Sequence, residues 1–176
     1  SLFVEGDLRA GDPAQAINAR GASMQVLGSR TAVSSTEVPL LFPTRPAGCR
    51  GLEGSSILNN KIVHAGEVLE LPAGSYCFHD LTAVNATIRG VGGPVTIYTE
   101  RVDLRNATVM GADRRPTNLT IHVLGHGSKA LVVGGTMWGA LNAPTADVRL
   151  SGGPQGATVV GSVVGRTIRA TGGVWV

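Results

Sequence analysis

Aromatic and charged residues are scarce in this sequence, and their scarcity restricts how a core can be built. Aromatic residues make up 4% of the 176 residues and charged residues 15%, whereas 43% are hydrophobic and 25 are glycine. Small aliphatic and β-branched side chains must therefore fill the core. Because glycine weakens helix interiors and no stretch forms an amphipathic helix of useful length, the composition indicates an all-β protein. The few large aromatics are expected to plug the core or the edges of the fold: Tyr76, Tyr98, Trp138 and Trp175.

Two classes of protein are disfavoured by what the sequence lacks. No apolar run is long enough to cross a bilayer as a helix, so no membrane span is expected in this chain. The net charge of +3 comes from cations that are nearly all arginines, scattered singly among the acids, with only Arg114 and Arg115 adjacent. A nucleic-acid-binding protein ordinarily concentrates its positive charge and interleaves aromatic residues, so no nucleic-acid partner is expected.

Groups that could carry out catalysis or hold a cofactor are isolated along the chain. Asp80 and Asp103 lie about one repeat apart, so they could stack around calcium, although like charges on adjacent strands repel without a cation. His122 and His126 have the spacing of a metal-binding pair on a helix, but the flanking glycines place them around a turn. No nucleophile elbow or phosphate-binding loop occurs. We therefore expect no catalytic residue, no metal and no cofactor, and a protein that is not an enzyme.

The two cysteines, Cys49 and Cys77, are too far apart in the sequence for a CxxC redox or zinc motif. If they are bonded, the disulfide contributes roughly 3–4 kcal/mol by closing a loop of about thirty residues in the unfolded chain. Cys49 lies in an irregular loop, rich in proline and glycine, at about 38–56, which the bond would fasten to the regular body. An even cysteine count favours an exported location, but the sequence leaves open whether the two are bonded.

Whole strand-and-turn units recur along the second half of the chain. The unit Thr87–Gly93 returns at Asp147–Gly153 and again at Thr167–Gly173, which fits one period of about twenty residues. Val84–Ile88 likewise returns as Arg105–Val109, offset by 21 residues. A unit of this size cannot bury its apolar side alone, so neighbouring units must stack and share a core. The repeats predict a solenoid from about Leu69 to Val176.

The length of the repeat and the alternation within it indicate the kind of solenoid. In Val95–Thr99 and Asn118–Val123 every second residue is aliphatic or bulky, as expected of a strand with one buried side. Coils of about 20–22 residues suit a right-handed parallel β-helix, whereas the left-handed form needs an aliphatic residue at every sixth position. A β-sandwich is the alternative fold, since it too has short strands and regular turns. We expect one domain spanning residues 1–176.

The segments at residues 71–78, 139–153 and 161–164 carry a resemblance to a known family. They read Leu71-Pro72-Ala73-Gly74-Ser75-Tyr76-Cys77-Phe78, a late coil from Gly139 to Gly153, and Gly161-Ser162-Val163-Val164. This arrangement resembles the β-solenoid domain of PilX-like, type IV pilus-associated bacterial proteins, although Leu141-Asn142 replaces the usual pair that bears an aromatic residue. The resemblance implies a bacterial protein at the cell surface or outside the cell, with pilus components as partners and no catalytic residues to transfer.

Two apolar, strand-like segments are expected to be the open ends of the stack. They are Leu2-Phe3-Val4 and Val174-Trp175-Val176, and neither is preceded or followed by an evident cap. Unpaired strand edges invite pairing with another chain, so we expect subunits to associate head to tail through these six residues. The leading hypothesis is a structural filament or pilus-associated subunit. The alternatives are a surface adhesin or glycan-binding β-helix, with surface glycans as partners, and a β-helix carbohydrate-active enzyme.

Overall fold

Alternation of apolar and polar residues favours strands with one buried side. In the described part of the chain these strands pair with one another only in parallel. The computed structural model describes residues 2–4, 8–10, 18–20, 24–26, 30–32, 43–47, 49, 59–152 and 156–175. Within these residues one sheet contains all fourteen strands. They are β1 (Leu2–Val4), β2 (Leu8–Ala10), β3 (Asn18–Arg20), β4 (Met24–Val26), β5 (Arg30–Ala32), β6 (Lys61–Val63), β7 (Val68–Cys77), β8 (Asp80–Val84), β9 (Thr87–Thr99), β10 (Arg101–Met110), β11 (Leu119–Val123), β12 (Lys129–Ser151), β13 (Ala157–Thr171) and β14 (Val174–Trp175).

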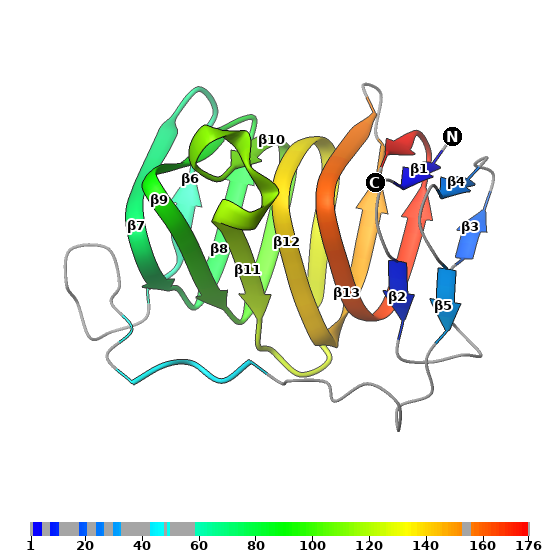
Figure 1. The fold of residues 1–176 in the computed structure, drawn as a ribbon, viewed down its shortest axis with the longest axis horizontal. Coiled ribbons are helices and arrows are strands. Elements are labelled where there is room, and N and C mark those ends of the chain that lie inside the picture. Colours follow the sequence, from blue (N-terminus) through cyan, green and yellow to red (C-terminus); the bar gives the residue numbers. More distant parts are fainter. Residues whose placement is uncertain are drawn as a thin grey trace.

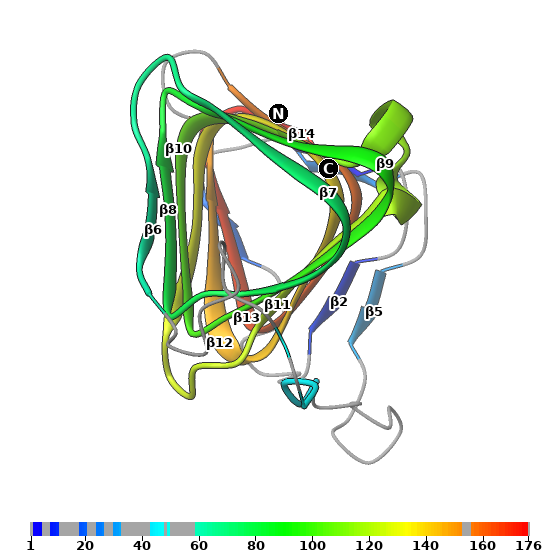
Figure 2. The ribbon, with the colours of Figure 1, turned by 90° about the vertical axis from the view of Figure 1, so that its left-hand side faces the viewer.

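The strands wind into a β-solenoid of about five turns, which confirms the predicted fold and excludes the β-sandwich (Figure 1). The chain advances from left to right in Figure 1 while the near strands β9 and β11 run downward, so the solenoid is right-handed. Viewed along its axis, the body has a triangular cross-section with three faces (Figure 2). The long strands β7, β9, β12 and β13 bend around corners and contribute to more than one face.

Each face is defined by the strand segments that stack on it. Face 1 consists of Lys61–Val63, Asp80–Val84, Arg101–Arg105, Lys129–Val133, Asp147–Ser151 and Thr167–Thr171. Face 2 consists of Val68–Pro72, Thr87–Val91, Ala107–Met110, Gly135–Trp138, Ala157–Val160 and Val174–Trp175. Face 3 consists of Gly74–Cys77, Val95–Thr99, Leu119–Val123, Gly139–Ala143 and Ser162–Gly165.

The core is a single column of aliphatic side chains along the solenoid axis. On each face every second residue points inward, as shown by the alternating burial along β11 and β12. Burial of a whole aliphatic side chain contributes about 1.5–3 kcal/mol, so stability grows coil by coil. The largest fully buried side chains are Leu71, Leu81, Ile88, Ile97, Leu104, Leu119, Ile121, Met137, Leu141 and Leu150.

The sequence repeats predict the observed register correctly for two pairs of neighbouring coils, and they do not predict the length of one further coil. Asp147 lies opposite Thr167 and Thr87 lies opposite Thr108, at the predicted offsets of 20 and 21 residues. The copies at Thr87 and Asp147 do not stack, because Thr87 is on face 2 and Asp147 is on face 1. One coil is longer than predicted: Ala107 pairs with Gly135, because two 3₁₀ turns are inserted between β10 and β11. These turns are η2 (Ala112–Arg114) and η3 (Pro116–Asn118).

The five N-terminal strands continue the solenoid beyond its C-terminal coil. β1 pairs with β14, and β2 and β3 pair with β13. β4 then pairs with β1, and β5 with β2. Within the predicted loop at 38–56, residues 43–47 and 49 contain no strand or helix, and the other residues of that loop lie outside the described part of the chain. Strands from both halves of the sequence therefore share one sheet.

Close approach between coils is expected to make Gly135 indispensable. Gly135 has a positive φ of 78°, and a Cβ atom there would collide with the backbone of Ala107 in the preceding coil. Gly92 has nearly the same φ of 77°, but a Cβ atom there would meet nothing within 4 Å. We expect Gly92→Ala to cost about 1–2 kcal/mol for the left-handed backbone alone, and Gly135→Ala to cost clearly more. Urea unfolding of the two variants measures the difference; equal losses would contradict the register.

Candidate functional site

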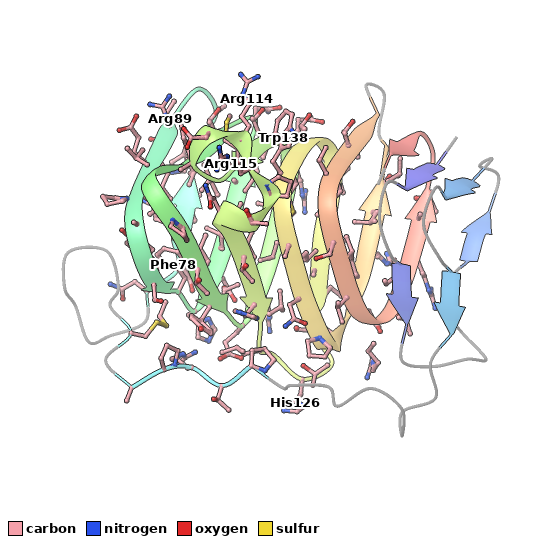
Figure 3. All side chains as sticks on the ribbon, in the orientation of Figure 1. Phe78, Arg89, Arg114, Arg115, His126 and Trp138 are labelled. Carbon is pink, nitrogen blue, oxygen red and sulfur yellow. A yellow bond between two sulfur atoms is a disulfide. The ribbon has the colours of Figure 1, made fainter. Side chains whose placement is uncertain are left out.

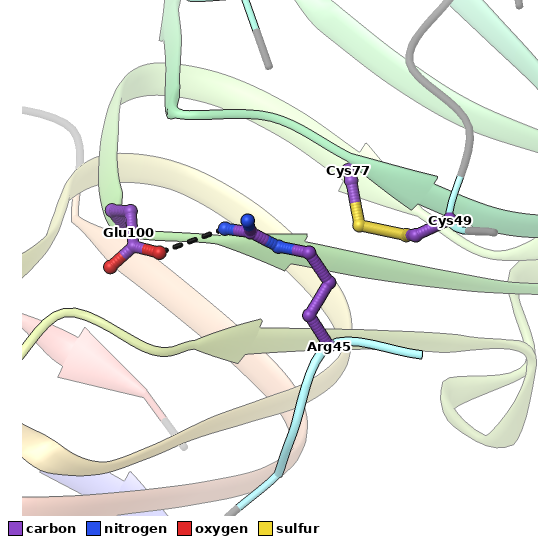
Figure 4. Close-up of a disulfide and its surroundings, with 4 residues drawn as sticks. All are labelled: Arg45, Cys49, Cys77 and Glu100. Atoms are coloured by element: carbon purple, nitrogen blue, oxygen red, sulfur yellow. Dashed lines mark hydrogen bonds and ion pairs between the residues drawn. A yellow bond between two sulfur atoms is a disulfide. The ribbon is translucent and has the colours of Figure 1, made fainter. Parts of the chain in front are cut away.

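A disulfide fastens the connecting segment to the side of the solenoid. Cys49 is bonded to Cys77, with 5.7 Å between their Cα atoms, which confirms the pairing that the sequence left open (Figure 4). The Nη2 atom of Arg45, in the same segment, lies 2.8 Å from Oε1 of Glu100 at the corner between β9 and β10. The side chain of Cys77 is fully buried at the end of β7. Two points of attachment therefore fix residues 43–47 and 49 against the first coils.

The segments predicted to be the open ends of the stack lie together inside it. Leu2 pairs with Val174 and Phe3 pairs with Trp175, so β14 has β13 on one side and β1 on the other. Val4 belongs to β1, which is itself flanked by β14 and β4. Val176 lies outside the described residues. The expectation placed these residues at opposite ends because it assumed that chain order equals stacking order, and the docking of the N-terminal coils breaks that assumption.

Other strands form the edges of the stack in the described part of the chain. At one end, β6 pairs only with β8 and β7 pairs only with β9. At the other end, β3, β4 and β5 each pair on one side only. The large hydrophobic side chains that are most exposed gather near β6 and β7: Ile62 is 50% exposed, Val68 56% and Val91 41%. This end combines unpaired backbone with exposed apolar side chains.

A groove of about 420 Å³ lies on face 2 beside the inserted 3₁₀ turns. Its lining residues are Val68, Glu70, Thr87, Arg89, Gly90, Met110, Gly111, Asp113 and Arg114. Glu70 and Arg89 form an ion pair across one wall. Asp113 and Arg114 both adopt positive φ, at 57° and 54°, which is uncommon for residues other than glycine. The guanidinium of Arg114 lies 5.7 Å from the ring centre of Trp138, whose side chain is on the outer side of β12 (Figure 3).

The position of Trp138 corrects the expectation that it plugs the core or an edge, because its strand segment is paired on both sides and its side chain points outward. Its side chain is half-buried on the outer surface, and Met137 beside it is the buried residue. The groove itself was missed by sequence reasoning, because the insertion that forms one wall has no repeat partner. The only feature of the sequence that marks this insertion is the pair of adjacent arginines, Arg114 and Arg115. Glu70 and Arg89 are each about half exposed, so solvent screens their ion pair and it contributes little to stability.

His122 belongs to a ladder of outward side chains on face 3, and His126 is separate from it. The His122 ring stacks on Tyr98, with 4.9 Å between ring centres, and its Nδ1 accepts a hydrogen bond from Nδ2 of Asn142 at 3.2 Å. Burial lowers the pKa of His122, which keeps the imidazole neutral at pH 7. His126 lies in the exposed turn after β11 (Figure 3). The two histidines therefore do not form a metal-binding pair.

The two aspartates that are one repeat apart in the sequence are out of register in the structure. Asp80 lies opposite Arg101, and Asp103 lies opposite Thr82. Asp103 is instead bound by Arg105 through two hydrogen bonds of 2.8 Å. The alternative in which these two carboxylates stack around calcium is therefore wrong. Among the residues that the structure describes, no group of three or more metal-ligating side chains comes together.

Asp147 begins a charged cluster at the corner where face 1 starts. Its Oδ1 accepts hydrogen bonds from Oγ1 of Thr167 at 2.7 Å and from Nη2 of Arg166 at 3.0 Å. The Thr167 hydrogen bond, aided by the nearby guanidinium groups, lowers the pKa of Asp147. Two residues further along each strand, Arg149 and Arg169 lie directly opposite each other. The repeated Asp/Thr-Val/Ile-Arg unit thus stacks arginine on arginine.

No family model matches this sequence, and no curated protein or solved structure is significantly similar to it. The described residues also contain no helix that is long and apolar enough to cross a membrane. The fold and the geometry of its surfaces therefore carry the functional argument.

Removal of the disulfide is expected to lower stability. In Cys49→Ser/Cys77→Ala the free energy of unfolding should fall by about 3–4 kcal/mol, because the unfolded chain regains the entropy of a 28-residue loop. Urea unfolding with and without dithiothreitol measures this loss. Reductant should destabilise the wild-type protein and leave the double variant unchanged. If the wild-type protein is also unaffected by complete reduction, the bond does not stabilise the fold.

Asp147 is expected to make stability depend on pH. Its pKa is lower in the folded chain than in the unfolded chain, so its charged form stabilises the fold above the ordinary value of about 4, and this contribution is lost as pH falls further. Asp147→Asn should therefore be less stable than the wild-type protein at pH 7, and the gap should close below about pH 4. Thermal unfolding across this pH range tests it, with Thr167→Val expected to reduce the gap. A gap that is independent of pH would contradict the assignment.

Proposed function

We propose that this β-solenoid is a non-enzymatic, extracellular structural subunit that stacks head to tail with further copies of itself. The observation that carries the proposal is the match between the two ends of the stack. Each end presents one strand per face whose outer edge is unpaired within the described residues. Because strand pairing is parallel throughout, a second copy placed on the axis continues the same winding.

The strands correspond face by face. On face 1 the outermost strands are β6 at one end and β3 at the other. On face 2 they are the first half of β7 and β4, and on face 3 the second half of β7 and β5. Addition of a copy would therefore form three short parallel pairs, one on each side of the triangle. Such an interface is heterologous and does not close, so it produces a filament.

Exposed apolar side chains at the β6–β7 end support the same contact. Ile62 and Val68 lie on the two strands that have free edges, and both are at least half exposed. Natural proteins usually protect sheet edges with charges, proline or a covering element. Exposed valine and isoleucine at a free edge instead favour an interface that is covered by a partner, and the second copy supplies that cover.

The location and the partners are proposed on separate grounds. The Cys49–Cys77 disulfide is compatible with an oxidising, extracellular location. The resemblance of residues 71–78, 139–153 and 161–164 to pilus-associated solenoid domains supports a bacterial cell surface, with pilus components as further partners.

Charge introduced at the free edge is expected to prevent assembly. The wild-type protein should form larger particles as its concentration rises, and Ile62→Lys/Val68→Lys should remain a single copy, because two cations would be buried in the interface. Sedimentation velocity over a concentration series and negative-stain electron microscopy measure this. The matched control is Thr82→Lys/Thr96→Lys, which adds the same charge to outward positions of β8 and β9, strands that are already paired on both sides, and should assemble like the wild-type protein. A wild-type protein that stays monomeric at every concentration, or a control that is equally impaired, would overturn the proposal.

A further inference from the structure

Coiling gathers much of the positive charge of the described residues on one face. Between β7 and β13 the strand segments of face 3 contain no Asp, Glu, Lys or Arg, and the N-terminal strands β2 and β5, which extend this face, add Arg9 and Arg30. Between β6 and β13, face 1 and the residues just before its segments hold seven cations and four acids. The cations are Lys61, Arg101, Arg105, Lys129, Arg149, Arg166 and Arg169, and the acids are Asp80, Glu100, Asp103 and Asp147. The cations are scattered along the sequence because each coil contributes at most two of them.

Arg149 and Arg169 are the centre of this positive face. They are directly opposite each other on neighbouring segments, about 4.8 Å apart in the pairing direction, and both are exposed. Like charges at opposed positions repel and destabilise a sheet. The nearest carboxylate, Asp147, is already bound by Arg166 and Thr167. Among the described residues, no carboxylate forms an ion pair with Arg149 or Arg169.

The chemistry of this face fits an anion that is supplied from outside. Each guanidinium can donate two parallel hydrogen bonds to a carboxylate or a sulfate group, and two neighbouring forks can hold one such group or two successive groups. Lys129 and Arg101 extend the positive charge over the two preceding coils on the same face. A polymer that bears an acidic group at regular intervals can therefore cross several coils and meet a cation on each.

Nucleic acid fits the same face less well. Single-stranded nucleic acids are held by aromatic side chains on which the bases stack, and the described segments of face 1 contain no aromatic residue. Base readout in double-stranded DNA requires an element that enters a groove, whereas this face is a flat sheet. An extended polysaccharide requires neither feature. We infer that face 1 binds an acidic polysaccharide, with Arg149 and Arg169 as its central contacts.

This binding does not depend on head-to-tail stacking, because every cation involved belongs to a single copy. Stacked copies would align their positive faces and bind the polymer more tightly through multivalency, but one copy suffices for contact. The assay therefore uses Ile62→Lys/Val68→Lys as well as the wild-type chain, so that failure of stacking and failure of binding are distinguished.

The test measures binding to immobilised polygalacturonate by biolayer interferometry, with neutral dextran and a short single-stranded DNA as comparison surfaces. The wild-type chain should bind polygalacturonate and should not bind dextran. Its affinity for polygalacturonate should fall as salt is added. Arg149→Gln/Arg169→Gln should lower the affinity by about tenfold or more, as loss of charge-assisted hydrogen bonds predicts. The control Arg114→Gln/Arg115→Gln removes the same charge from the exposed insertion on face 2 and should bind within about twofold of the wild-type chain.

Three results would overturn the inference. They are absence of binding to polygalacturonate at low salt, an equal loss of affinity in the two double variants, and tighter binding to DNA than to polygalacturonate. Thermal unfolding of both double variants accompanies the assay. Arg149→Gln/Arg169→Gln should be at least as stable as the wild-type protein, because it removes a repulsive pair.

Discussion

Every buried side chain in this β-solenoid depends on backbone pairing between neighbouring coils. A single coil of short strands has an apolar inner side but nothing to cover it, so it gains a core only when the coils above and below it are in register. Thr99 shows how tightly this is arranged at the corners: its buried hydroxyl contacts the carbonyl oxygens of His79 in the preceding coil, at 3.0 Å, and of Arg101, at 2.8 Å. Glycines such as Gly135 and Gly161 allow adjacent backbones to approach where a Cβ atom could not fit. Register, rather than any one side chain, holds the structure together.

The same constraint leaves the outward positions free to differ from face to face. Inward residues are aliphatic, as Leu81, Val102 and Ala130 are on face 1. Their outward neighbours are not restricted in this way. Face 1 is positively charged, and face 2 has the groove beside the inserted 3₁₀ turns. Face 3 has the uncharged ladder of side chains around His122. A regular inner lattice thus supports three surfaces with distinct chemistry.

The parts of the fold that sequence could predict are those in which the signal is local. The Thr167–Arg169 unit copies Asp147–Arg149 because the two units stack, so the period, the winding and the alternation were all visible in the sequence. Three features were not. The pairing of Leu2 with Val174 joins residues that are far apart in the sequence, and no repeat indicates it. The insertion at η2 and η3 has no counterpart in other coils. The outward position of Trp138 depends on the strand register rather than on its hydropathy. The charged face was hidden for a related reason, since its members are one coil apart.

Docking of β1–β5 on the C-terminal coil also fixes an order of events during synthesis. These strands leave the ribosome before their partners in β13 and β14 do. The body from β6 to β13 can accumulate coil by coil through contacts between neighbouring segments, whereas β1–β5 cannot dock until β13 and β14 have been made. A solenoid that otherwise grows by local additions is therefore completed by its most distant contact. Until those partners emerge, β1–β5 have no strand of the body to pair with.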